Sequence, residues 1–255
     1  MISCSTRGLL LYVILAMLSV PTSGQPRLAT HLHQPTPGLF LPVEMRESVR
    51  AGKTPVGARI HAQVTQRVPL SPNEYLDRHL KVFGTVITSI AGDAKSGIPS
   101  ELQVRFDKIS YREEEIPMKT DVIAVASMVE VNDTAAPANG STDRGNPSQA
   151  NWTTRQVGGD EVYRSGWVGD VYDDVMKKVG FADYYGVYST ALPMPQSQTS
   201  LPRAMGVFST NAKGLYGFER DTVFSSGEGT MCLSSHSHRV SLSGGDNLLL
   251  KIVGP

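Results

Sequence analysis

The sequence has little cysteine, no net charge and one long apolar run. Its two cysteines are Cys4, which precedes that run, and Cys232, which follows it. Removal of the N-terminal segment during export would leave one thiol and no intramolecular disulfide, so packing must supply the stability. We expect Cys232 to be a buried strand residue, because free cysteine behaves as a small hydrophobe. The 24 basic and 24 acidic residues balance, which argues against a nucleic-acid partner, because such proteins need a broad positive field.

Motifs of common catalytic and cofactor sites are also missing. The chain contains no Gly-x-Ser-x-Gly, Cys-x-x-Cys, His-Glu-x-x-His, phosphate-binding loop or dinucleotide-binding glycine pattern. The nearest approach to a nucleophile turn is Ser225-Ser226-Gly227, which a hairpin loop explains better. We therefore predict no cofactor and no catalytic residue. A hydrolase whose site is assembled from distant loops stays open as an alternative.

The apolar run near the N-terminus predicts a signal peptide over residues 1–24. Arg7 is the lone charge before 13 uncharged, mostly apolar residues from Gly8 to Val20. That length falls short of the roughly 20 residues of a membrane helix, and small residues up to Gly24 suit cleavage. We expect export to the periplasm, the outer membrane or the extracellular space, with no membrane span after signal removal. An uncleaved N-terminal anchor is the alternative.

Glycine and proline together occupy 40 of the 255 positions, which favours a turn-rich β protein over a helical bundle. Two segments alternate apolar and polar residues with a period of two, as half-buried strands do. Their apolar members are Ile60, Ala62, Val64, Leu102, Val104 and Phe106. We predict a mainly β fold with a single antiparallel barrel or sandwich. An extended leader over 25–41 precedes its first part, 42–131, and its closing strands lie in 205–255.

Residues 132–204 are predicted to form an insertion in this β domain. Residues 132–151 include no aromatic, Leu, Ile, Val or Met residue and are predicted to be a flexible loop. The remainder is rich in aromatic residues and glycine. Within it, the apolar residues from Val171 to Val179 fit either a short amphipathic helix or a hairpin.

Aromatic side chains of the insertion are the candidate binding residues, because they supply large contact areas at low entropic cost. The candidates are Tyr163, Trp167, Tyr172, Tyr184, Tyr185 and Tyr188. The alternative is that they form a second small core or pair within the β-sheet.

The candidate metal ligands are His236 and His238. On a strand, residues two apart share a face, so the two imidazoles could bind one Zn²⁺ or Cu²⁺ ion. The surrounding run from Ser234 to Arg239 is polar, and an exposed loop is the alternative.

Several of these segments together resemble the periplasmic barrel module of type IV secretion channel proteins, part of the outer-membrane core complex. The segments that carry the resemblance are Gly57–Gln66, Val82–Ile87, Leu102–Ile109, Glu115–Met118 and the ending Ser243–Val253. The resemblance implies a β-barrel in the cell envelope. In two places the chain departs from that family: Asn73–His79 replaces a usual Pro-x-Gly turn, and 132–204 lacks the apolar helices that cross the outer membrane. A pore is therefore not implied.

The stretch Thr154–Gly159 is similar to one in a family of exported bacterial β-rich proteins of unassigned activity. We therefore expect a non-enzymatic, exported envelope protein that acts as a protein-binding or scaffold module. Its partner would be another envelope protein or a second copy of itself, bound through an edge strand or the aromatic patch. A metal-binding module and a hydrolase are the two alternatives.

Overall fold

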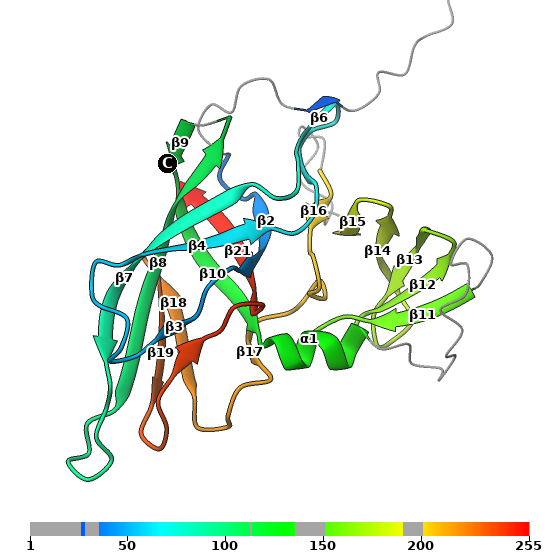
Figure 1. The fold of residues 1–255 in the computed structure, drawn as a ribbon. Helices are drawn as coiled ribbons and strands as arrows, with labels where there is room; N and C mark the ends of the chain where they lie inside the picture. Colours follow the sequence, from blue (N-terminus) through cyan, green and yellow to red (C-terminus); the bar gives the residue numbers. More distant parts are fainter. Residues whose placement is uncertain (1–26, 29–35, 113, 136–150, 191–200, 255) are drawn as a thin grey trace, which may run out of the picture.

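The main sheet of the protein wraps into a nearly closed barrel (Figure 1). The computed structural model describes residues 27–28, 36–112, 114–135, 151–190 and 201–254. In spatial order the barrel strands are β17 (Gly214–Tyr216), β10 (Lys119–Ala126), β21 (Asn247–Gly254), β2 (Phe40–Met45), β4 (Arg59–Val64), β7 (Lys81–Ile90), β8 (Ser100–Tyr111), β19 (Thr230–Ser235) and β18 (Val223–Gly227). A further strand, β9 (Glu114–Pro117), pairs with β8. All neighbours along this path are antiparallel except β17 and β10, so the prediction of a mainly β, antiparallel barrel is confirmed.

The barrel interior is filled by the apolar residues that alternate along its strands. Ile60, Val64 and Phe106 are at most 2% exposed, because successive side chains of a strand point to opposite faces. In β21 residues on both faces are buried. Leu248 and Leu250 face the barrel core, and Leu249 packs outward in a second cluster of buried residues.

The barrel closes between β10 and β18 through side chains. The Ser226 hydroxyl accepts a hydrogen bond from the Val122 N–H at 2.9 Å, and an Asp121 carboxylate oxygen accepts one from the Gly229 N–H at 3.3 Å. No backbone ladder joins the two strands as the structure describes them. Ser225 and Ser226 belong to a β-hairpin, as expected, but they lie in its strand β18 rather than in its loop, which is the two-residue turn Glu228-Gly229.

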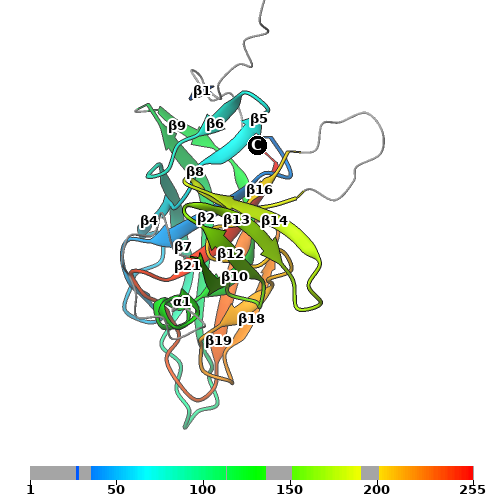
Figure 2. The same ribbon diagram turned by 90° about the vertical axis from the view of Figure 1, so that its right-hand side faces the viewer.

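A second, six-stranded sheet forms the insertion, and we call it the meander because each strand pairs with the next. Its strands are β11 (Asn151–Arg155), β12 (Glu161–Ser165), β13 (Val168–Tyr172), β14 (Lys178–Asp183), β15 (Gly186–Ser189) and β16 (Arg203–Ala204). Val171 lies in β13 and Val179 in β14, with a turn between them. The segment is therefore a hairpin, and the helical interpretation was wrong. The two views in Figures 1 and 2 place the meander beside the barrel wall.

One helix, α1 (Met128–Ala135), leads from the barrel to the insertion. The Ser127 hydroxyl accepts a hydrogen bond from the Glu130 N–H at 3.2 Å, which is an N-terminal cap. The predicted loop 132–151 is therefore wrong at both ends, because residues 132–135 are helical and Asn151 begins β11. Residues 136–150 lie outside the described part of the chain.

Short strands complete the fold near the two ends of the barrel. They are β1 (Arg27–Leu28), β5 (Val68–Ser71), β6 (Glu74–Leu76), β3 (Val49–Arg50) and β20 (Ser241–Leu242). Strands β1, β6 and β5 form one small sheet, and β3 pairs with β20. The predicted leader 25–41 thus contains β1 and the start of β2. The predicted signal peptide, 1–24, lies outside the described residues. Within the described ranges, no helix has the length and apolar character needed to cross a bilayer.

Buried polar side chains join the meander to the barrel. The Gln66 side chain, 4% exposed, accepts hydrogen bonds from the N–H groups of Gly206 (2.7 Å) and Val187 (3.2 Å) and donates one to the Val187 carbonyl (2.9 Å). The buried Asp160 carboxylate accepts hydrogen bonds from the N–H and the hydroxyl of Thr210 at 2.7 and 2.9 Å. Since these acceptors and donors satisfy buried backbone groups, they fix the position of the meander. We call this set of contacts the joint.

Candidate functional site

The structure divides the six predicted aromatic residues into three groups. Tyr163 and Tyr172 pair edge to face with ring centroids 5.5 Å apart. Trp167, Tyr184 and Tyr185 form a separate run of edge-to-face contacts, with centroids 5.7 and 5.6 Å apart. Tyr188 is 4% exposed and belongs to the main core cluster. The sequence could not separate these groups, because the separation depends on which turns and faces carry each ring.

The second group continues onto the barrel side through Arg67. The Arg67 guanidinium carbon lies 3.5 Å from the ring centroid of Tyr185 and 4.3 Å from that of Tyr75. A guanidinium between two ring faces is a cation–π arrangement. We call Trp167, Tyr184, Tyr185, Arg67 and Tyr75 the aromatic ladder. It runs from the turns of the meander to β6. Arg67 and Tyr75 are the two members that the sequence analysis did not select.

Local backbone geometry presents the ladder to solvent. The Asp183 carboxylate accepts hydrogen bonds from the N–H groups of Tyr185 (2.7 Å) and Gly186 (3.0 Å) and so holds the β14–β15 turn. Gly186 has a positive φ of 150°, and a Cβ there would lie 2.5 Å from the Gln66 side chain. The tight turn leaves Tyr184 and Tyr185 66% and 45% exposed.

A groove of about 250 Å³ lies beside the ladder. Its walls include Tyr75, Tyr185, Phe181, Tyr188, Pro69 and Pro202. Glu74 and Asp183 add carboxylates to this lining. The groove is thus ringed by aromatic and proline surfaces with two acidic groups and the stacked Arg67.

Tyr188 forms a rigid wall of this groove. Its ring stacks on Phe181 with centroids 5.3 Å apart, and its hydroxyl donates a hydrogen bond to the Arg67 carbonyl at 3.1 Å. Burial raises the pKa of the Tyr188 hydroxyl far above its usual range. The hydroxyl therefore stays protonated and anchors the same residue whose guanidinium joins the ladder.

The Tyr163–Tyr172 pair lies outside the groove lining. The Tyr163 hydroxyl donates a hydrogen bond to the Glu161 carboxylate at 3.1 Å, and this bond raises the pKa of Tyr163. Neighbouring Lys178 and Asp170 form an ion pair at 2.7 Å. The two tyrosines therefore belong to a local cluster of the meander outside the groove lining, which makes Tyr163 suitable for a matched control variant.

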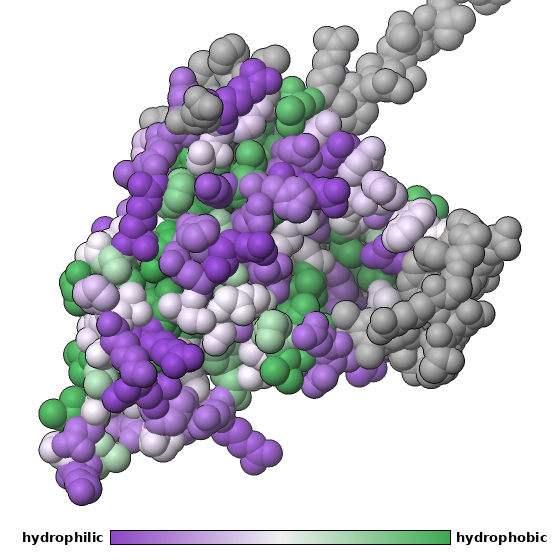
Figure 3. Space-filling model, in the orientation of Figure 1, coloured by the Kyte–Doolittle hydropathy of each residue, from purple (hydrophilic) through white to green (hydrophobic). Residues whose placement is uncertain are grey.

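Figure 3 shows one face of the molecule coloured by hydropathy. Hydrophilic residues cover most of its described part, and apolar residues are scattered between them.

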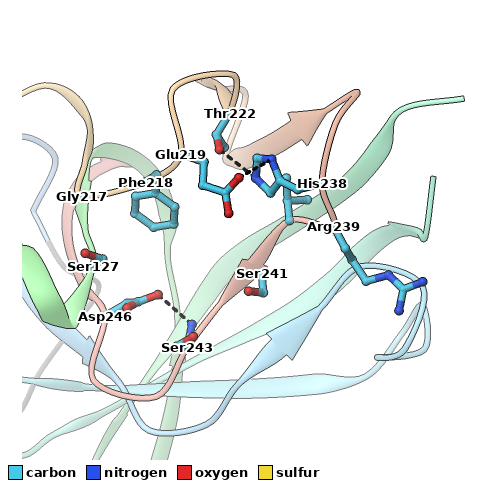
Figure 4. A pocket seen from close by; sticks show the side chains of 11 residues that line it. Ser127, Gly217, Phe218, Glu219, Thr222, His238, Arg239, Ser241, Ser243 and Asp246 are labelled. Atoms are coloured by element: carbon cyan, nitrogen blue, oxygen red, sulfur yellow. Dashed lines mark hydrogen bonds and ion pairs between the residues drawn. The ribbon is translucent and has the colours of Figure 1, made fainter. Parts of the chain in front are cut away.

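A second candidate site, which is polar, lies at the open end of the β18–β19 hairpin (Figure 4). The His238 Nδ1 atom lies 3.1 Å from an Asp221 oxygen and 3.2 Å from a Glu219 oxygen. The Thr222 hydroxyl lies 3.2 Å from His238 Nε2. His236 is exposed and is not part of this cluster. Strand β19 ends at Ser235, so the two predicted histidines do not share a strand face, and the loop alternative is correct.

Serine hydroxyls hold Asp221 in place. Ser235 donates a hydrogen bond to its carboxylate at 2.7 Å, and Ser237 donates a second one to the same oxygen. These bonds lower the pKa of Asp221 from 3.8 to about 2. The carboxylate is therefore ionised throughout the neutral and mildly acidic range.

A pocket of about 210 Å³ adjoins His238. Phe218, Ser241 and Asp246 line it together with residues of the cluster. Burial raises the pKa of Asp246, whose carboxylate accepts hydrogen bonds from the N–H groups of Met128 and Ser243. The order Thr222, His238, Asp221 is that of a hydroxyl–imidazole–carboxylate relay. The same carboxylate and imidazole atoms are also suited to holding a cation.

Cys232 lies on β19, as expected, but its side chain is half-buried rather than buried. It points to the opposite face from Met231 and Leu233, which fill the core. Burial and the charge of Glu101 raise the pKa of the Cys232 thiol. A raised pKa lowers the thiolate fraction, so this cysteine is a poor nucleophile.

We found no match to this chain among protein families, curated protein sequences or solved structures.

Proposed function

We propose that this chain is an exported, non-enzymatic protein-binding module of a bacterial cell envelope, with the aromatic ladder and its groove as the binding surface. The observation that carries the proposal is the continuous contact from Trp167 to Tyr75 through Arg67. Exposed aromatic side chains with few rotatable bonds lose little entropy on binding and dominate interaction energies. The predicted signal peptide and the resemblance to a periplasmic barrel module support the envelope location.

The proposed ligand is an extended segment of another exported protein that contains prolines and at least one basic residue. Proline-rich segments in the polyproline II conformation dock in aromatic-lined grooves. The groove offers the rings of Tyr75, Tyr185 and Phe181 for such a segment. The carboxylates of Glu74 and Asp183 in its lining supply charge complementarity for a basic side chain.

Hydrogen bonds between the meander and the barrel side hold this surface in place. Gln66 holds Val187 and Gly206, and Tyr188 holds the backbone of Arg67. The ladder is therefore pre-organised, and less ordering entropy is lost on binding.

The test is a titration of the purified protein, expressed from the full chain, with a synthetic decaproline peptide that carries an arginine at each end. We expect binding by calorimetry and perturbed amide resonances around Tyr75 and Tyr185. Tyr185→Ala should weaken binding about fivefold or more, since a central aromatic contact contributes more than about 1 kcal/mol.

Tyr163→Ala is the matched control, because Tyr163 is an exposed meander tyrosine outside the groove lining. It should bind the peptide as the unaltered protein does. Equal weakening in both variants, or no binding of the peptide by the unaltered protein, would reject the proposal.

A further inference from the structure

We propose that Glu219, Asp221 and His238 bind one Zn²⁺ ion at the open ends of the β18–β19 hairpin. This site is separate from the aromatic ladder, and its existence does not depend on the function proposed above. It uses one of the two predicted histidines, His238, with two carboxylates that the sequence did not suggest.

The spacing of the ligand atoms fits a coordination shell. His238 Nδ1 lies 3.1 and 3.2 Å from oxygens of Asp221 and Glu219, and all three ligand atoms lie within 4.8 Å of one another. Zinc bonds of about 2.0–2.2 Å place tetrahedral ligand atoms roughly 3.3 Å apart. Glu219 has a side chain that is 70% exposed, so its carboxylate is free to adjust to the ion.

More oxygen atoms surround His238 Nδ1 than one ring N–H can hydrogen-bond. Besides the two carboxylates, the hydroxyls of Ser235 and Ser237 lie 2.9 and 3.3 Å from the same nitrogen. A single N–H donates one good hydrogen bond. A divalent cation in place of that proton would attract the carboxylates from the same position and balance their two negative charges.

Contacts around the cluster orient the ligands. The Thr222 hydroxyl lies 3.2 Å from His238 Nε2. With the ion bound, His238 takes the Nε2–H tautomer, whose proton this hydroxyl can accept, and the Nδ1 lone pair binds the ion. The hydrogen bonds from Ser235 and Ser237 hold Asp221 through its other oxygen, Oδ2, so Oδ1 stays directed at the imidazole. One nitrogen and two carboxylate oxygens form a donor set that suits zinc, with an open position for water.

The test is calorimetric titration of the chelator-treated protein with ZnCl₂ at neutral pH, together with thermal unfolding. We expect one ion per chain and a raised melting temperature, because the ion binds the folded state. His238→Ala and Glu219→Gln should each weaken binding at least about tenfold, which is about 1.4 kcal/mol. Glu219 is mostly exposed, so its variant keeps the fold even if His238→Ala does not.

His236→Ala is the matched control, because this neighbouring histidine is outside the cluster. A second control, His31→Ala with His33→Ala, removes the other His-x-His pair in the sequence. Both controls should bind zinc like the unaltered protein. The proposal is overturned if the unaltered protein binds no zinc, if Glu219→Gln binds it with full affinity, or if either control abolishes binding.

Discussion

The barrel and the meander are both antiparallel β-sheets, yet different forces hold them. The barrel interior contains large, fully buried side chains, among them Phe106, Leu102 and Met45. The buried cluster within the meander holds four residues, none larger than valine: Val162, Val171, Ala182 and Val187. Because hydrophobic stabilisation scales with buried apolar area, the barrel stabilises itself and the meander does not.

The small core of the meander explains why the meander depends on the joint. A small sheet without a sufficient core is marginal on its own in water. Gln66 and Asp160 fix the meander through five hydrogen bonds to Val187, Gly206 and Thr210. Tyr188 and Ala204 of the meander add apolar contacts with the barrel core, and these contacts and hydrogen bonds together position the aromatic ladder.

The largest expected effect is a core truncation in the barrel. Phe106→Ala should lower the free energy of unfolding by about 3–5 kcal/mol, because it removes a fully buried ring and leaves a cavity. Val171→Ala in the meander should cost less than half as much. Urea denaturation followed by circular dichroism measures both. Equal losses would mean that the meander contributes to the same cooperative core.

The next effect is at the joint. Gln66→Ala removes the acceptor of the Val187 and Gly206 N–H groups, at a cost of about 2–3 kcal/mol, while the Val187 carbonyl keeps its hydrogen bond from the Met205 N–H. Hydrogen exchange should speed up in β15 and β16 while β7 and β8 keep their protection. Gln63→Ala is the control, since the Gln63 amide bonds only to the His79 carbonyl, near the end of β4. Faster exchange throughout the barrel would contradict the division between the two regions.

The smallest effect is electrostatic and is confined to the barrel. The pKa of Asp221 is lowered from 3.8 to about 2 in the folded protein. Its carboxylate therefore contributes stability above about pH 4, and this is lost as the pH falls to about 2. In metal-free protein, Asp221→Asn should flatten the dependence of melting temperature on pH in that window. Glu228→Gln, in the turn of the same hairpin, should leave the dependence unchanged.

The sequence predicts the barrel well because each of its strands has one face inside. The alternation at Ile60, Ala62 and Val64 therefore maps directly onto burial. In β12 only Val162 is buried, so the meander carries no comparable pattern and its strands could not be assigned. Helix α1 spans residue 132, where the composition of the sequence changes. A loop boundary predicted from that change therefore misses the helix.

The candidate sites were only partly predictable. Tyr184 and Tyr185 could be selected as aromatic residues, but nothing in the sequence connects them with Arg67 across the joint. The partners of His238 could not be predicted from strand register, because Glu219 and His238 lie beyond the ends of β18 and β19. The prediction of a shared face for His236 and His238 failed for the same reason, since it continued the strand beyond Ser235.

The pairing of β2 with β21 has a consequence for how the chain is made. Phe40 lies opposite Lys251 and Val43 opposite Leu248. The first barrel strand in the sequence therefore pairs with the last one. During synthesis, β2 has no ladder partner on this side until residues 247–251 emerge. Such long-range closure slows folding and exposes apolar strands in the meantime. A chaperone that covers nascent strands would therefore act on this protein before its last segment arrives, and deletion of β21 would remove a neighbour from both β2 and β10.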